Sequence, residues 1–322
     1  MNNKNRRSFF KASATAGVSL AFSQLISPVK AIANEIEFKG EKRFQKNVSP
    51  WPICLDTATI RPASLEKKVE IAAKAGYDAI EPWDGELEEY EKAGGNLKAL
   101  GKKIKDLGLF VPSVIGLWNA LPPTRELFDA SLADTRRRMR MAAEIGANHI
   151  QTIPNTVGEN YDHHWVADRY RDLIEIGLKE YNIQPALVFV KFFPINTLGQ
   201  AVGIALDTNH SKAQVIPDVY HMYISDGGFN NLKNIPGSMI AIFQFNDAPD
   251  APPKADLADK HRVYPGDGIL PLTQILKDLK ATGFKGCVSL ELYNENYHKQ
   301  DLLEVAKTGL RKTLEVIKKS GV

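Results

Sequence analysis

The chain has 322 residues, of which 43% are hydrophobic and 25% are charged, and its formal charge is +3. This composition is ordinary for a globular protein, so it excludes an intrinsically disordered chain and a bundle of membrane helices. The length suits one large α/β domain or two ordinary domains.

The first 33 residues differ from the rest of the chain. Arg6 and Arg7 stand just before two phenylalanines, a weakly apolar run follows at 12–26, and a small-residue cleavage site, Ala-Ile-Ala, follows at 31–33. This order is typical of a twin-arginine export signal, although an ordinary basic N-terminus is the alternative. The apolar run is shorter than the roughly 20 residues of a membrane-spanning helix. We therefore expect a periplasmic protein without a stable membrane anchor.

The positive charge of the chain lies in this N-terminal segment. Cleavage after residue 33 removes five basic residues and no acidic residue, which changes the formal charge from +3 to −2. A slightly negative mature protein lacks the basic surface of a nucleic-acid-binding protein. We therefore expect no nucleic-acid partner.

After a polar linker at 34–50, short apolar runs alternate with amphipathic stretches, which is typical of βα units around a parallel sheet. The strands are expected at 53–56, 79–83, 110–116, 149–153, 186–190, 215–218, 240–245 and 288–293. The helices are expected at 65–75, 97–107, 131–145, 168–181, 198–207, 270–281 and 302–318. Eight strands in this order predict a single α/β domain, a (β/α)8 TIM barrel over 51–322.

The sixth strand could be placed in either of two segments. Residues 206–210 end in Asp-Thr-Asn-His, but they continue a helical pattern and would leave a long gap before the seventh strand. A strand within 214–221 restores the spacing and makes Asp218 and His221 the candidate site residues. His210 is then expected at the opposite end of the barrel, where residues contribute to stability.

Only two cysteines are present, Cys54 in the first predicted strand and Cys287 in the last. Neighbouring strands could bring them together, but two cysteines make no disulfide framework. We expect both to be small buried apolar residues.

Polar residues at the ends of the last three strands mark the expected site, because active sites of (β/α)8 barrels lie at the C-terminal ends of the strands. Asp218 ends the sixth strand and precedes His221, Gln244 lies in an apolar seventh strand, and Glu291 interrupts the eighth. Burying these groups singly is costly, and a shared cation would offset that cost. Separate hydrogen bonding of each residue is the alternative. The ligand types suit manganese or magnesium, with cobalt or zinc as alternatives.

Four segments of the chain resemble the sugar phosphate isomerase/epimerase family, whose barrel is xylose-isomerase-like. They are PDVYH at 217–221, FQFNDAP at 243–249, HRVYPGDG at 261–268 and GCVSLELYN at 286–294. The resemblance covers roughly 50–320 and is most specific in its last third.

The resemblance implies a divalent metal held by residues at the ends of the fifth to eighth strands. Carried over by position, it makes Asp218, Gln244 and Glu291 the ligands, with His221 beside them. The fifth strand departs from the pattern, because Val188 stands where the family has a Glu that serves as ligand and as acid/base. Occupancy of the metal site is therefore in doubt.

The chemistry implied by the family removes a proton next to a carbonyl while a cation stabilises the enediolate. Returning the proton elsewhere usually requires a second acid/base group. With Val188 in place, Glu291 is the obvious base, and His221 is a ligand or a proton carrier. A one-base elimination, addition of water or a weakened activity then fits better than a two-base epimerase. Lys191 is a candidate replacement base or oxyanion partner, or else a solvated surface residue.

Further side chains are expected to contact the substrate. Glu81 could bind a sugar hydroxyl, Trp83 could stack on a ring or simply pack, and Arg262 could contact a hydroxyl, carboxylate or phosphate. His163 and His164 follow the fourth strand and could join the site. Free sugar phosphates are scarce outside the cytoplasm, so an unphosphorylated sugar, keto sugar or polyol is the expected partner.

Two functions from different classes follow. The first is a divalent-metal-dependent sugar or keto-sugar isomerase, epimerase or lyase. The second is a metal-free, non-catalytic carbohydrate-binding barrel that has kept the cleft and lost turnover. A barrel endonuclease shares the fold, but the export signal and the mature charge argue against it. The sequence names neither the substrate nor the metal, and it is compatible with an oligomer.

Overall fold

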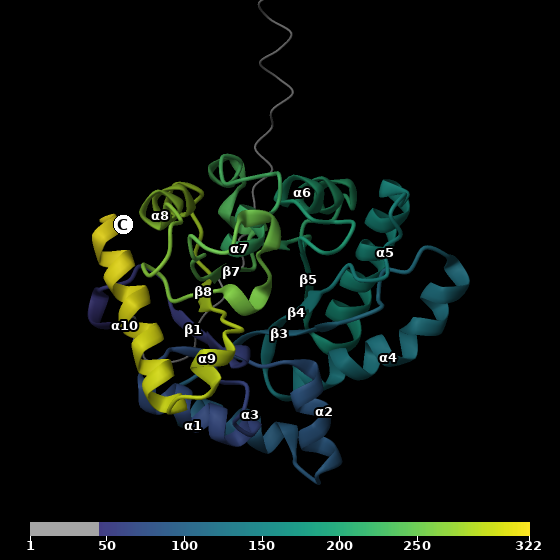
Figure 1. The fold of residues 1–322 in the computed structure, drawn as a ribbon. Helices are drawn as coiled ribbons and strands as arrows, with labels where there is room; N and C mark the ends of the chain where they lie inside the picture. Colours follow the sequence, from purple (N-terminus) through teal and green to yellow (C-terminus); the bar gives the residue numbers. More distant parts are fainter. Residues whose placement is uncertain (1–44) are drawn as a thin grey trace, which may run out of the picture. The chain divides into compact units, whose positions relative to one another are not determined.

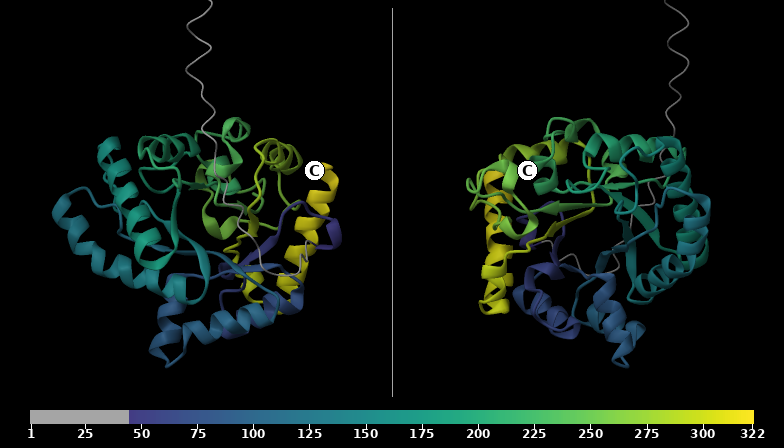
Figure 2. Two further views of the ribbon diagram at one scale, coloured as in Figure 1. Left: turned by 180° about the vertical axis from the view of Figure 1, so that it is seen from behind. Right: turned by 45° about the vertical axis from the view of Figure 1, so that its right-hand side comes forward.

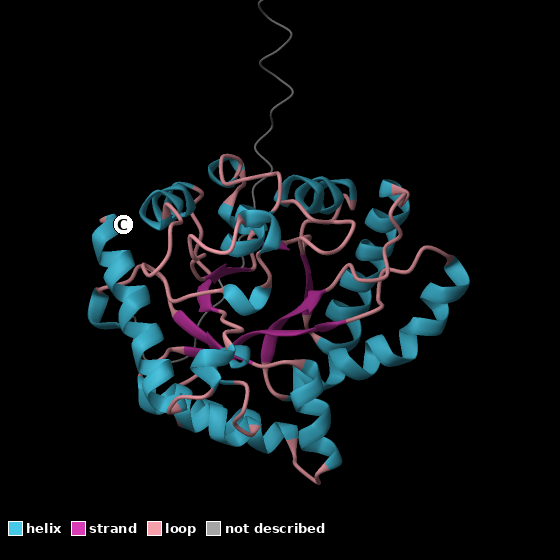
Figure 3. Cartoon of the chain, viewed as in Figure 1, coloured by secondary structure: helices cyan, strands magenta, loops and turns pink. Residues whose placement is uncertain are grey.

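The computed structural model describes residues 45–322. Eight short strands are arranged around one axis, and helices surround them (Figure 3). The strands are β1 (Ile53–Asp56), β2 (Ala79–Glu81), β3 (Val111–Leu117), β4 (Ala147–Thr152), β5 (Gln184–Val188), β6 (Val215–Ile216), β7 (Ile242–Phe245) and β8 (Cys287–Leu290). No helix among the described residues is long and apolar enough to cross a membrane.

The strands close into a parallel barrel in chain order (Figure 1). Two four-stranded sheets have the orders β2-β1-β8-β7 and β3-β4-β5-β6. Parallel bridges between Ala79 and Phe110 and between Trp83 and Ile115 join β2 to the start and end of β3. A parallel bridge between Asp218 and Gln244 joins the ends of β6 and β7. The C-terminal ends of all eight strands therefore face the same opening of the barrel.

The helices form the outer layer. They are α1 (Leu65–Ala75), α2 (Asp84–Lys92), α3 (Leu97–Asp106), α4 (Arg125–Glu144), α5 (His163–Ile176), α6 (Leu198–Asp207), α7 (Val219–Ile224), α8 (Leu272–Ala281), α9 (Glu295–His298) and α10 (Leu302–Ser320). Helix α1 ends at Gly76, whose φ of 94° is a left-handed conformation that glycine adopts without strain. The last helix, α10, packs against α1 and so closes the ring of helices (Figure 2).

Two apolar cores result from this arrangement. The larger one fills the space between strands and helices, and the smaller one fills the inside of the barrel. Cys54 and Cys287 both lie in the inner core as buried free thiols. The expectation of two small buried residues without a disulfide is confirmed.

All eight predicted strands and all seven predicted helices are present, with boundaries that shift by a few residues. Two short helices at the mouth, α7 and α9, and the polar helix α2 were not predicted. The sixth strand lies at Val215–Ile216, as the spacing predicted, and His210 precedes it at the other end of the barrel, 3.4 Å from Glu175. The predicted export signal at 1–33 and most of the linker at 34–50 lie outside the described residues.

One buried carboxylate fixes the long loop between β7 and α8. Asp247 accepts hydrogen bonds from the backbone N–H groups of Ala248 and Leu270 through Oδ1, at 2.8 and 3.0 Å, and of Gly266 and Gly268 through Oδ2, at 2.9 and 3.1 Å. A Cβ at Gly268 would overlap the carbonyl oxygen of Ala248, so only glycine lets the loop approach this closely. The segment 261–268, whose function the sequence left open, is therefore folded around Asp247.

Replacing Asp247 by alanine is expected to lower the free energy of unfolding by about 3 kcal/mol, because several buried N–H groups lose their acceptor together. Urea denaturation followed by circular dichroism measures this change. Asp267→Ala is the matched control on the same loop, since Asp267 pairs with Lys312 at the surface, and it should change stability by about 0.5 kcal/mol or less. Equal stability of the two variants would contradict this role for Asp247.

Candidate active site

The mouth of the barrel holds most of the residues that the sequence singled out. Asp218 begins α7 as its N-cap, and its Oδ1 accepts hydrogen bonds from the backbone N–H groups of Tyr220 and His221 at 2.6 and 3.2 Å. This cap holds Asp218 at the end of β6 and leaves Oδ2 for other partners. Gln244, in β7, is paired with Asp218 by the bridge between the strands, and Glu291 follows β8.

A buried guanidinium lies at the centre of these residues. Arg262, from the loop after β7, is 1% exposed. Its Nη1 donates to Asp218 Oδ2 at 2.6 Å and to Glu291 Oε2 at 2.8 Å. Its Nη2 and Nε donate to Asp259 Oδ1 at 2.6 and 3.1 Å, and Nη2 lies 3.2 Å from His221 Nε2. All five N–H donors of the guanidinium therefore face protein acceptors.

The charges in this cluster follow from burial and from Arg262. Burial alone would raise the pKa of Asp218, but the Arg262 guanidinium holds it at about 2, so this carboxylate is ionised. Burial raises the pKa of Glu291 well above its ordinary value, against the opposing effect of Arg262, and the charges of Asp56 and Asp218 raise it further. Burial lowers the pKa of His221. Near neutral pH the imidazole is therefore neutral.

Two more carboxyl groups lie in the barrel next to this cluster. Glu81, in β2, accepts hydrogen bonds from Gln151 Nε2 at 2.7 Å and Ser289 Oγ at 2.8 Å. Burial, with the charge of Glu291, raises the pKa of Glu81 to about 8. Asp56, at the end of β1, has its pKa raised well above its ordinary value by burial and by Glu81. Several buried carboxyl groups whose pKa values are raised therefore lie close together.

Asp56 has a buried oxygen without a hydrogen-bond partner among the described residues. Its Oδ1 accepts from the backbone N–H of Ala58 at 2.7 Å and from Trp83 Nε1 at 3.3 Å. Its Oδ2 has no hydrogen-bond partner among the described residues. Buried polar atoms without a partner are rare, and each one calls for an explanation such as a bound molecule. Sequence reasoning missed Asp56, although its place at the C-terminal end of a strand was a usable signal.

Aromatic side chains line the rim. Trp83 stacks on Trp118 with ring centroids 6.1 Å apart, and it meets Tyr293 edge to face at 6.0 Å. The guanidinium of Arg61 lies 5.5 Å from the centre of the Trp83 ring and 5.4 Å from that of Tyr293. The Tyr293 hydroxyl donates to Glu291 Oε1 at 2.6 Å. The rim therefore joins aromatic surface directly to a titratable carboxyl group.

The described residues do not fit the predicted divalent-metal site. They contain no group of three or more His, Cys, Asp or Glu side chains arranged to hold a metal ion. Val188 ends β5 as part of the apolar inner core and offers no ligand atom, whereas Gln244 is buried in β7 beside Asp218. Arg262 already binds the carboxylate oxygens that a metal would need. The ligand set Asp218, Gln244 and Glu291 is therefore adjacent in space but is not a metal centre in this structure.

Other predicted residues are placed differently from the expectation. Glu81 is fully buried inside the barrel, so it is better placed to tune its neighbours than to bind a sugar hydroxyl directly. His163 lies 2.7 Å from Asp207 on α6, and His164 lies 4.0 Å from it, so these histidines do not join the site. Lys191 approaches the site only through its backbone N, 3.5 Å from His221 Nδ1.

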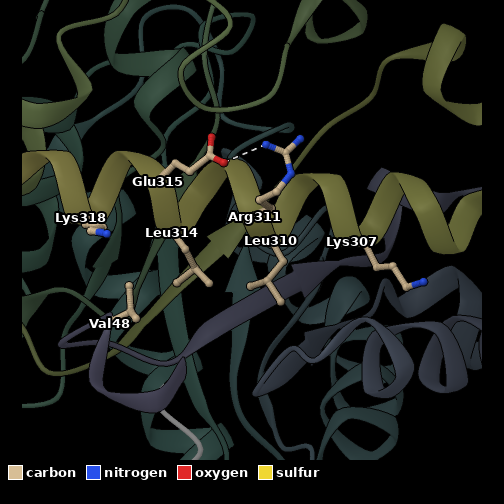
Figure 4. A pocket seen from close by; sticks show the side chains of 7 residues that line it. All are labelled: Val48, Lys307, Leu310, Arg311, Leu314, Glu315 and Lys318. Atoms are coloured by element: carbon tan, nitrogen blue, oxygen red, sulfur yellow. Dashed lines mark hydrogen bonds and ion pairs between the residues drawn. The ribbon is translucent and has the colours of Figure 1, made fainter.

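A hollow lies on the outer side of α10, away from this chemistry (Figure 4). Leu310, Leu314 and Val48 form its apolar floor, and charged side chains of α10 surround them. It contains none of the residues of the barrel mouth. We therefore assign the candidate active site to the mouth.

Comparison with known proteins identifies a family of TIM barrels that this chain matches. Residues 69–320 match the family model described as xylose isomerase-like TIM barrel. The inosose isomerase of Bacillus licheniformis is 27% identical over 280 residues, which cover 83% of this chain and 98% of that enzyme. The 3-dehydroshikimate dehydratase of Pseudomonas putida is 26% identical over 255 residues, which cover 78% of this chain and 39% of that protein.

A solved structure supports the same fold. The IOLI protein, solved with a bound zinc atom, superposes with a TM-score of 0.76 at 24% sequence identity, covering 83% of this chain and 98% of that chain. The resemblance and the barrel fold predicted from sequence are confirmed. The two relatives named above are enzymes that act on small carbohydrate-like molecules, which supports the prediction of an enzyme.

The raised pKa of Glu81 predicts how stability depends on pH. The carboxyl group binds its proton more tightly when folded, so its contribution to stability is complete below about pH 4.5 and is lost as the pH rises through about 8. Glu81→Gln keeps the shape of the neutral carboxyl group and removes the titration. Between pH 5 and 8 the wild-type chain should lose about 3 kcal/mol of stability relative to this variant.

Urea denaturation at a series of pH values measures this difference. Glu126→Gln is the control, because Glu126 is exposed on α4, and its stability should follow that of the wild type across the range. Parallel curves for the wild type and Glu81→Gln would show that Glu81 is ionised in the folded protein at neutral pH.

Proposed function

We propose that this chain, which belongs to the xylose isomerase-like TIM barrel family, is an enzyme that abstracts a proton next to the carbonyl of a carbohydrate-like substrate. The observation that carries the proposal is the cluster of buried carboxyl groups with raised pKa at the barrel mouth, Asp56, Glu81 and Glu291. Such clusters are typical of acid/base sites. The activities named for the relatives, an inosose isomerase and a 3-dehydroshikimate dehydratase, fit the same substrate class.

Glu291 is the proposed base. It touches both the Tyr293 hydroxyl and the Arg262 guanidinium, and its raised pKa makes its ionised form a stronger base toward a carbon acid. When the proton moves to Glu291, the negative charge moves to the oxygen of the substrate. The fixed positive charge of Arg262 lies beside the cluster throughout, so this transfer does not leave an uncompensated buried charge.

Asp56 is the proposed second acid/base group. Its unpartnered Oδ2 and its raised pKa suit a carboxylic acid that gives a proton to the substrate. Its charge raises the pKa of Glu291, so the two groups interact. Asp56 would supply the second group that the sequence did not reveal when Val188 was found in place of Glu. Protonation of carbon completes an isomerisation or epimerisation, and protonation of a departing hydroxyl completes a dehydration.

The rim is the proposed contact for the face of a sugar or cyclitol ring. Trp83 and Tyr293 present aromatic surface next to Glu291 and Asp56. Aromatic rings bury the apolar face of such a ring, while polar groups beside them bind its hydroxyls. This arrangement supports the predicted role of Trp83 in binding substrate.

Deuterium exchange tests the proposed reaction whichever product forms. The chain is incubated in D2O with inosose, 3-dehydroshikimate or unphosphorylated keto-hexoses, and loss of the C–H signal next to the carbonyl is followed by proton NMR. We expect enzyme-dependent exchange with at least one compound. Glu291→Gln should slow it about 10²-fold or more, because it removes the base.

Matched variants separate the roles of the two carboxyl groups. Asp56→Asn should slow product formation more than deuterium exchange if Asp56 acts in the second proton transfer. Glu295→Gln, an exposed change on α9 close to the site, should keep the wild-type rate. Saturable binding without exchange would instead support the non-catalytic carbohydrate-binding barrel.

We also propose that the chain is exported by the twin-arginine route to the periplasm. The support is the order of paired arginines, an apolar run and a cleavage site in 1–33. Cell fractionation should find the protein shortened at its N-terminus in the periplasm. Replacing both Arg6 and Arg7 by lysine should leave the full-length form in the cytoplasm. Equal export of both forms would contradict the route.

A further inference from the structure

We propose that the guanidinium of Arg262 is the permanent cation of this site and that the site takes no divalent metal. The inference goes beyond the proposed reaction and does not depend on whether the site turns over a substrate. It rests on three observations at the barrel mouth. Arg262 lies between Asp218 and Glu291, Val188 offers no ligand atom, and every N–H of Arg262 has an acceptor.

The guanidinium of Arg262 lies where a metal ion bound by these carboxylates would lie. Asp218 Oδ2, at the end of β6, and Glu291 Oε2, at the end of β8, lie 2.6 and 2.8 Å from Nη1 of Arg262. A metal ion bound by these oxygens would lie about 2 Å from each of them. It would therefore compete for the space of Nη1 and repel the guanidinium. Arg262 is 1% exposed and cannot turn its charge to solvent without leaving the site.

The carboxylate and imidazole groups around Arg262 already have hydrogen-bond partners. Asp218 Oδ1 caps α7, and Glu291 Oε1 accepts from Tyr293. His221 Nε2 faces Nη2 of Arg262. A metal would have to break the hydrogen bonds that hold Arg262 and leave a buried guanidinium without its partners, which is strongly unfavourable.

The surrounding loop and side chains hold Arg262 in place. Asp259, three residues earlier in the loop, accepts from both Nε and Nη2. Asn294 donates to the backbone carbonyl oxygen of Arg262 at 3.1 Å, and Asp247 fixes the loop that follows. The rings of Tyr220 and Tyr293 lie 5.1 and 4.9 Å from the guanidinium carbon. The guanidinium is therefore built into the structure and is not a mobile side chain that fills an empty centre.

Metal content and thermal stability test the inference without any activity assay. The full chain is purified without chelator, analysed by mass spectrometry for metals, and melted with EDTA, ZnCl2 or MnCl2. We expect far less than one metal ion per chain and a shift in Tm of less than about 1 °C with either metal. Near-stoichiometric zinc or manganese that Glu291→Gln removes would overturn the proposal.

A double variant should convert the site into a metal-binding site. Val188→Glu with Arg262→Ala restores a third carboxylate and removes the competing cation, and it should bind close to one zinc ion per chain. Arg262→Ala alone is the control and should bind none tightly. Strong zinc binding by that control would show that the ligands of a metal site are complete without a carboxylate at 188 and that Arg262 only blocks them. This result would contradict the inference. If the double variant does not fold, the metal content of the wild type decides the question.

Two single substitutions test whether the site depends on the guanidinium. Arg262→Lys keeps one positive charge with three donors, whereas Arg262→Met keeps the length and leaves Asp218 buried without a cation. We expect Tm to fall for lysine and to fall further for methionine. A methionine variant as stable as the wild type would contradict the inference. Because none of these readouts needs turnover, an inactive but metal-free protein would refute the proposed function and leave this inference standing.

Discussion

The buried ion-pair cluster around Arg262 is the interaction on which the mouth of the barrel depends. One guanidinium satisfies acceptors on α7, on the strand end after β8 and on its own loop. Burying a single charge costs several kcal/mol, and removing one partner from such a network is more costly than never forming it. The ends of β6 and β8, the short helix α7 and the long loop after β7 are therefore held in one arrangement. The catalytic groups that we propose are positioned by the same contacts.

Local hydrogen bonds elsewhere in the barrel place the residues of this cluster. Asp218 uses one oxygen to cap α7 and so has the other to offer. Asp247 gathers four backbone N–H groups and brings the loop back over the barrel, which places Arg262 above β6 and β8. The inner core below remains apolar, with Val188 and the two cysteines among its members. Burial in that low-dielectric environment is what raises the pKa of Asp56, Glu81 and Glu291.

The strands and most helices could be predicted because their apolar periodicity is local, and the register of the sixth strand followed from spacing alone. The grouping of Asp218, His221, Gln244 and Glu291 followed from the rule that strand ends share one opening. The central place of Arg262 could not be predicted, because it depends on the path of a loop that only Asp247 and Asp259 define. The same holds for Asp56, whose importance lies in an oxygen without a partner, a property that exists only after folding. Sequence reasoning treated Arg262 as a substrate contact and a metal as the cation, whereas the geometry assigns the role of cation to Arg262.

A cation supplied by the protein affects which charged groups the site can accept on a substrate. The charge of Arg262 is balanced by Asp218, whose pKa of about 2 keeps it ionised. Burial raises the pKa of Asp56 and Glu291, so the deep part of the site disfavours additional negative charge and favours hydroxyl and carbonyl groups over an anion. A charged group on the substrate would be better placed at the rim, where Arg61 lies over Trp83 and Tyr293. Transfer of a proton from the substrate to the ionised Glu291 moves one negative charge onto the substrate and leaves the net charge of the interior unchanged. A divalent ion would compete with Arg262 for the same carboxylate oxygens of Asp218 and Glu291, and Val188 supplies no further ligand atom.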